Sequence, residues 1–145
     1  MKFSILTLLV AIMAATEVTA VSDHVVCYTK NSFAIDAIHA FCRSRKDIVV
    51  PSDYAHKGGV ARKSGRNKSG IDYALMTNVH IDGNCKPAQW VPQKYCMFQF
   101  KNMCANAGKG YYGASEKRFG RNKCQKWSIV VKVRPKTGKV PLLTN

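Results

Sequence analysis

The residues that could carry acid–base chemistry are few in this chain of 145 residues. After residue 20 the chain has one glutamate, Glu116, whereas a glycosidase usually needs two carboxylates that face one bond. The sharpest enzymatic hypothesis is a small ribonuclease, which needs a general base, a general acid and a cation for the phosphate. The candidates for those roles are His80, Glu116, Arg118 and Arg121. His80 is expected on the outward face of a strand and Glu116 in a loop, so a noncatalytic protein is favoured.

Aromatic and basic residues alternate between positions 109 and 121. Aromatic rings can stack on sugars or bases while neighbouring cations hold anionic groups. An interpretation of equal weight is that these rings pack onto a sheet and the glycines between them form turns. The predicted contact surface consists of Lys109, Tyr111, Tyr112, Lys117, Arg118 and Arg121, with Arg62, Lys63 and Arg66 as a second basic patch. The second patch also resembles a nuclear-import sequence, which would matter only after uptake into another cell.

The net charge of +15 indicates that the binding partners are anionic. Lys2 and Glu17 both lie in the first 20 residues, so removal of that segment leaves the net charge unchanged. A field of this size draws a protein toward nucleic acid, acidic lipid or acidic polysaccharide without choosing among them. Weak nonspecific adhesion is the alternative. No cofactor is expected, and nucleic acid stays open as a partner.

The first 20 residues, MKFSILTLLVAIMAATEVTA, have the pattern of a cleaved signal peptide. Lys2 supplies the positive charge, an apolar stretch follows, and Ala20 ends a small-residue cleavage pattern. The alternative is a membrane anchor, but the apolar stretch has about 11 residues whereas a bilayer span needs roughly 20. We therefore expect a secreted protein with a domain over residues 21–134. Residues 135–145, which include two of the five prolines, are expected to form a poorly ordered tail.

The six cysteines that follow the predicted signal peptide are Cys27, Cys42, Cys85, Cys96, Cys104 and Cys124. An even count in a short exported chain predicts three disulfides, and six cysteines allow 15 connectivities. A metal site is not expected, because there is no Cys-x-x-Cys pair and no histidine cluster beside the cysteines. The expected pairings are Cys42 with Cys96 or Cys104, and Cys85 with Cys124. Asn67 begins an N-glycosylation sequon.

Two helices are predicted from apolar periodicity. The first covers residues 32–45, with Asn31 or Ser32 as its cap and an apolar stripe that includes Cys42. The second begins at Pro92 and continues to about residue 107, with Cys96 and Cys104 on one face.

Four strands are predicted beside these helices. Alternation is clearest over residues 71–82 and from Cys124 to residue 133, and shorter strands are expected over residues 25–28 and 47–51. The glycine-rich basic segment 55–70 is expected to be an exposed loop or hairpin tip, and the glycine-rich basic segment 109–123 is expected to be a second loop. The predicted fold is an α+β sandwich stapled by disulfides, with about four mostly antiparallel strands and both helices on one face.

The order of cysteines and elements resembles that of small secreted cysteine-rich proteins of filamentous fungi. The resemblance rests on the early Cys27, the helix with Cys42, the Gly83-Asn84-Cys85 sequence, the helix with Cys96 and Cys104, and the CQKWSI strand from Cys124. The chain is most similar to the α/β-sandwich group of killer-toxin-like and necrosis-associated effectors and a mushroom glycan-binding protein. The resemblance implies a disulfide-bonded sandwich, no metal, no catalytic residues and a role outside the fungal cell. The basic segment 55–70 and the basic tail depart from the group and leave glycan specificity open.

These observations together predict a secreted, noncatalytic effector or virulence-type protein of a filamentous fungus. It would be a monomer that binds glycans, cell-wall polymers or another anionic target on a host or competitor, with uptake into host cells left open. One alternative is a membrane-active antimicrobial or killer-toxin-like protein, although no strongly amphipathic basic helix is evident. The other is the small secreted ribonuclease.

Overall fold

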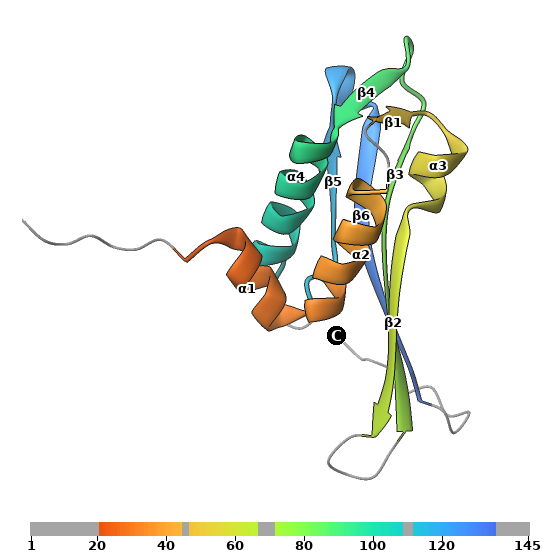
Figure 1. Cartoon of the computed structure of the whole chain (residues 1–145). Helices are drawn as coiled ribbons and strands as arrows, with labels where there is room; N and C mark the ends of the chain where they lie inside the picture. Colours follow the sequence, from red (N-terminus) through yellow and green to blue (C-terminus); the bar gives the residue numbers. More distant parts are fainter. Residues whose placement is uncertain (1–20, 45–46, 67–71, 109–111, 136–145) are drawn as a thin grey trace, which may run out of the picture.

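The structure of the chain is a computed structural model that describes residues 21–44, 47–66, 72–108 and 112–135 (Figure 1). The predicted signal peptide, Asn67 of the sequon, Lys109, Tyr111 and residues 136–145 of the predicted tail lie outside the described residues. Within the described part, no helix combines the length and apolar character that a membrane span requires.

The main sheet has four antiparallel strands in the order β2–β3–β6–β5. These strands are β2 (Gly59–Arg66), β3 (Asp72–Gly83), β5 (Ser115–Phe119) and β6 (Gln125–Pro135). A second sheet pairs β1 (Asp47–Val50) with β4 (Gln89–Pro92), also antiparallel. The predicted α+β class with antiparallel strands is confirmed.

Three helices lie on one face of the main sheet: α1 (Asp23–Lys30), α2 (Ser32–Cys42) and α4 (Gln93–Ala105) (Figure 1). The short helix α3 (Asp53–Lys57) follows β1 and contacts β3. Helices α2 and α4 are the two that the sequence predicts. The side chain of Asn31 caps α2 by accepting hydrogen bonds from the backbone N–H groups of Phe33 and Ala34. Pro92 is the N-cap of α4.

The predicted strand over residues 25–28 is wrong, because these residues belong to helix α1. Ser22 provides the cap, since its side chain accepts a hydrogen bond from the backbone N–H of Val25. Asp23 adds a favourable negative charge in the first turn. These end effects outweigh the strand preference of the two valines, and the helix buries Cys27 against α4.

Segment 55–70, predicted as an exposed loop or hairpin tip, and segment 109–123, predicted as a loop, both contain regular structure, and β2 pairs antiparallel with β3. Residues 55–70 include part of α3 and the whole of β2, and residues 109–123 include β5 and the 3₁₀ helix η2 (Arg121–Lys123). Strands β2 and β5 form the two edges of the main sheet, so backbone pairing with a stronger neighbour holds them despite their polar composition. Gly59 also permits a close approach of β2 to α2, because a Cβ there would lie 2.4 Å from the carbonyl oxygen of Ala37.

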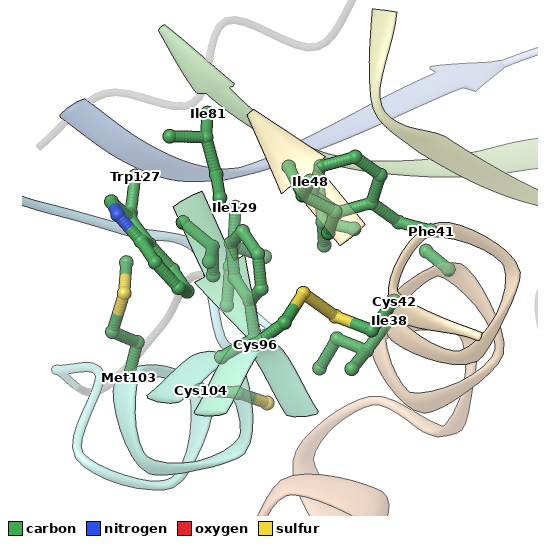
Figure 2. Close-up of a cluster of buried hydrophobic side chains, with 14 of the residues drawn as sticks. Ile38, Phe41, Cys42, Ile48, Ile81, Cys96, Met103, Cys104, Trp127 and Ile129 are labelled. Atoms are coloured by element: carbon green, nitrogen blue, oxygen red, sulfur yellow. A yellow bond between two sulfur atoms is a disulfide. The ribbon is translucent and has the colours of Figure 1, made fainter. Parts of the chain in front are cut away.

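The core lies between the main sheet and the helices and is centred on Trp127, Phe41 and Phe100 (Figure 2). The rings of Phe100 and Trp127 are 4.8 Å apart between centroids. Three disulfides surround this core: Cys27–Cys104, Cys42–Cys96 and Cys85–Cys124. The expected pairing of Cys85 with Cys124 is confirmed, and Cys42 pairs with Cys96 rather than with Cys104. A disulfide of this kind stabilises a small domain by about 2–4 kcal/mol.

Candidate functional site

Alternation along the strands gives the main sheet two different faces. One face carries Thr77, Val79, Trp127 and Ile129 into the core. We call the opposite face, which points away from α1, α2 and α4, the outer face. The strand register arranges its side chains in rows, and four of these rows are Asp82–Lys126–Arg118, His80–Ser128–Glu116, Val60–Asn78–Val130 and Arg62–Met76–Lys132.

A basic pocket lies at the end of the outer face that carries Arg118. It has a volume of about 410 Å³ and is lined by Asn84, Lys86, Gln89, Arg118, Arg121, Asn122, Lys123 and Cys124. Four of these residues are cationic and none has a carboxylate. Because like charges repel, such a group of cations favours the binding of an anion. Arg118 belongs both to the pocket and to the outer face, so the two surfaces are continuous.

A hydrogen-bond chain that starts in the core holds the floor of this pocket. The indole N–H of Trp127 donates to Gln125 Oε1 at 2.9 Å, and Gln125 Nε2 donates to Gln89 Oε1 at 3.2 Å. The same Gln89 oxygen accepts the backbone N–H of Arg121 at 3.0 Å. The turn that presents Arg121 and Lys123 is therefore fixed relative to a buried tryptophan.

The backbone of that turn is strained. Asn122 and Lys123 have φ angles of 57° and 54°, in the left-handed region that costs residues with a Cβ roughly 1–2 kcal/mol each. Strain of this kind persists where surrounding contacts enforce it, and it is concentrated at functional sites. The strained turn points the basic residues of η2 into one pocket.

The structure divides the predicted contact surface. Arg118 and Arg121 come together in the basic pocket. Lys117 lies on the opposite face of β5 from Arg118. Phe119, two residues after Lys117 and therefore on the same face, packs on Trp127 in the core. Tyr112 is exposed but lies elsewhere, because its carbonyl oxygen accepts a hydrogen bond from Asn31 Nδ2 at the start of α2.

The second predicted patch is divided in the same way. Arg62 lies on the outer face of β2, in the row of Met76 and Lys132. The Nζ atom of Lys63 lies 5.2 Å from the ring centroid of Phe33, on the helix side of the sheet. The side chain of Arg66 lies outside the described residues. Arg62 and Arg118 stand on opposite edges of the sheet and near opposite ends of the strands.

Sequence reasoning missed two of the four pocket cations, Lys86 and Lys123. Each is adjacent to one cysteine of the Cys85–Cys124 disulfide. Because the sequence predicts the Cys85–Cys124 pairing, it could also have predicted that Lys86 and Lys123 lie in the same region of the fold.

The ribonuclease candidates His80 and Glu116 share one row of the outer face, on either side of Ser128. His80 Nδ1 lies 2.7 Å from Asn78 Oδ1, and His80 Nε2 lies 3.3 Å from Asp82 Oδ2. Burial lowers the pKa of His80, the charge of Asp82 opposes this, and His56 and Lys126 lower the pKa further. Glu116 is paired with Lys126 at 3.3 Å, so both candidates already have partners.

No family model, no curated protein and no solved structure matches the chain. Within the described ranges, histidine, cysteine and carboxylate side chains form no group of three or more that could hold a metal ion. The basic pocket and the outer face are the features of the described residues that bear on function.

Proposed function

We propose that this chain is a secreted, noncatalytic protein that binds acidic glycans through the basic pocket. The observation that supports this most directly is the convergence of Lys86, Arg118, Arg121 and Lys123 around one concave site without a carboxylate. Planar guanidinium groups make bidentate hydrogen bonds to carboxylate, sulfate or phosphate groups, so two arginines favour an acidic group in the pocket.

The remaining pocket residues favour a sugar as the carrier of that acidic group. Asn84, Gln89 and Asn122 line the pocket with amide groups, which can donate to and accept from hydroxyl groups. A volume of about 410 Å³ lies within the usual range of about 300–1,000 Å³ for small-ligand sites. A polar pocket of this size suits a uronic acid or a sulfated sugar better than a lipid chain.

The three disulfides support an extracellular setting, because such bonds persist in oxidising compartments and are rare in the cytosol. A role as an effector of a filamentous fungus on a host or competitor rests on the resemblance in cysteine and element order. On this proposal the ligand would be an acidic polymer of a foreign cell surface or cell wall.

Binding to immobilised polygalacturonate, a sulfated glucan and a neutral glucan tests the pocket. We expect binding to the two acidic polymers and weak binding to the neutral one. The double substitution Arg118→Ala/Arg121→Ala should weaken acidic binding about ten-fold, as expected for two ion contacts of about 0.7 kcal/mol each. Lys117→Ala is the matched control, since Lys117 neighbours Arg118 on β5 but faces the other way. Equal weakening by both variants, or equal binding of neutral glucan, would contradict the proposal.

The shared row of His80 and Glu116, next to Arg118, also favours the ribonuclease as a second candidate function. RNA degradation by the purified protein that His80→Ala abolishes would support it. Intact RNA after prolonged incubation with the unsubstituted protein would exclude it.

A further inference from the structure

The far end of the outer face carries a second pair of cations. We call the row Arg62–Met76–Lys132 the distal row. Arg62 and Lys132 are both exposed, and neither forms a salt bridge with any residue that the structure describes. The pocket cations and the distal row thus form two basic ends of one sheet face.

We propose that an acidic polysaccharide chain lies along the outer face, parallel to β6, from the basic pocket to the distal row. This inference rests on the proposed function and extends it from one sugar unit to a polymer. Lys126 stands opposite Arg118 at the pocket end, and Lys132 marks the distal row. These two lysines are six positions apart on one strand, which corresponds to about 20 Å at roughly 3.3 Å per residue. A single sugar unit cannot span that distance, whereas a polysaccharide can.

The two carboxylates in these four rows do not prevent an anionic chain from lying there, because each has a positive or titratable partner. Glu116 is paired with Lys126 at 3.3 Å. The two oxygens of Asp82 face His56 Nδ1 at 2.5 Å and His80 Nε2 at 3.3 Å. Within these rows the carboxylates are therefore paired, whereas no salt bridge among the described residues involves Arg118, Arg62 or Lys132.

The middle of the outer face suits the neutral part of a sugar chain. Val60, Asn78 and Val130 form one row, in which an amide stands between two apolar side chains. Sugar rings have an apolar face and hydroxyl edges, and such a row can contact both.

The arrangement of cations, carboxylates and apolar side chains on the outer face disfavours RNA as the occupant. A nucleic acid carries a negative charge at every nucleotide. A strand along β6 would bring phosphates next to the carboxylates of Glu116 and Asp82 and against the apolar row. A polymer with acidic groups near its two ends of contact avoids both costs.

Chain-length dependence of binding tests this inference. The full chain would be titrated by calorimetry with digalacturonate, which is too short to reach both ends, and with a long, partly methyl-esterified polygalacturonate, in which neutral units separate the acidic ones. Arg62→Ala/Lys132→Ala should weaken polymer binding about five- to ten-fold, since two exposed ion contacts are worth about 1–1.4 kcal/mol together, and should leave dimer binding unchanged. Lys63→Ala is the matched control, because it removes a neighbouring positive charge from the other side of β2 and should change neither affinity.

The outcomes separate this inference from the proposed function. If Arg118→Ala/Arg121→Ala weakens both ligands but Arg62→Ala/Lys132→Ala weakens neither, the pocket stands and the extended site is wrong. If the pocket variant changes nothing, the proposed function itself fails. Tighter binding of single-stranded RNA than of the partly methyl-esterified polygalacturonate, or leakage of dye from anionic vesicles at binding concentrations, would overturn the polysaccharide as the occupant. Unchanged thermal unfolding of each variant confirms that a loss of affinity is not a loss of fold.

Discussion

The two edge strands of the main sheet each carry neighbouring cations, and the sheet divides each pair between its faces. On β5, Arg118 lies on the outer face and Lys117 on the helix side; on β2, Arg62 and Lys63 are divided likewise. The edges differ in what supports them. Arg118 stands beside a strained turn, a disulfide and a hydrogen-bond chain from Trp127. Arg62 lies on the edge strand β2, which pairs with β3 and packs against α2 at Gly59.

This difference indicates which end determines affinity. A site whose backbone is held in place before binding loses less conformational entropy when the ligand arrives. The Cys85–Cys124 disulfide and the hydrogen-bond chain from Trp127 hold the backbone of the basic pocket, so it should bind even a short ligand. The distal row is exposed and less constrained, so it should contribute only when a long ligand is already held at the pocket.

Removal of the Cys85–Cys124 disulfide should have the largest effect on this comparison. Cys85→Ala/Cys124→Ala should lower the free energy of unfolding by about 2–4 kcal/mol, because the unfolded chain regains freedom over the bridged segment. It should also weaken binding of acidic glycan, although no cation is removed, since Lys86 and Lys123 would no longer be held together. Urea unfolding and calorimetry measure the two effects. Unchanged affinity in the folded variant would show that the disulfide does not organise the pocket.

Relief of the backbone strain at Lys123 should have a smaller effect than removal of the disulfide, and it should change stability and binding in opposite directions. Lys123→Gly removes the penalty of a left-handed φ of 54° and should raise the free energy of unfolding by up to about 1 kcal/mol. The same change removes a pocket cation and should weaken glycan binding about three-fold. Thermal unfolding would show the gain in stability, and calorimetry would show the loss of glycan affinity in the same variant. A loss of stability would mean that contacts of the lysine side chain outweigh the backbone strain.

Much of the fold follows from the sequence because several elements have long periodic patterns of their own. Helices α2 and α4 and strands β3 and β6 each bury one side in the core. Their positions predict the Cys85–Cys124 disulfide and a link from Cys42 to α4, with Cys96 or Cys104 as its partner. Strands β2 and β5 could not be predicted in this way, because a polar edge strand is specified by its partner. Helix α1 was missed because Val25 and Val26 favour a strand, whereas the caps at Ser22 and Asp23 decide the outcome.

The candidate site was only partly predictable for a related reason. Arg118 and Arg121 stand out in the sequence as members of a basic cluster. Whether neighbouring cations share a face depends on the alternation of side chains along β5, and this strand was predicted as a loop. Lys86 and Lys123 meet only through the Cys85–Cys124 bridge, which joins segments 39 residues apart. The rows of the outer face depend on the register of three strand pairs, which composition does not encode.

The smallest expected effect concerns pH and the middle of the outer face. Burial is the main cause that lowers the pKa of His80; His56 and Lys126 lower it further, and Asp82 opposes them. Burial is also the main cause that lowers the pKa of His39. The positive charges of Arg43, Lys101 and His24 lower it further, and Asp36 opposes them. Below about pH 6.5 the unfolded chain therefore binds more protons at these histidines than the folded chain, so stability should fall as the pH is lowered through this range.

Thermal unfolding at pH 7.5 and pH 5.5 measures this effect, because the lower value remains above the usual pKa of Asp and Glu, about 3.9–4.3. The unsubstituted protein should unfold at a lower temperature at pH 5.5. His80→Gln keeps a hydrogen-bonding side chain but cannot take up the proton, so its unfolding temperature should depend less on pH, with His39 responsible for the remainder. The same pH dependence in both proteins would show that His80 is protonated equally in the folded and unfolded chains. In that case Asp82, rather than burial, would control the charge in the row between the two basic ends.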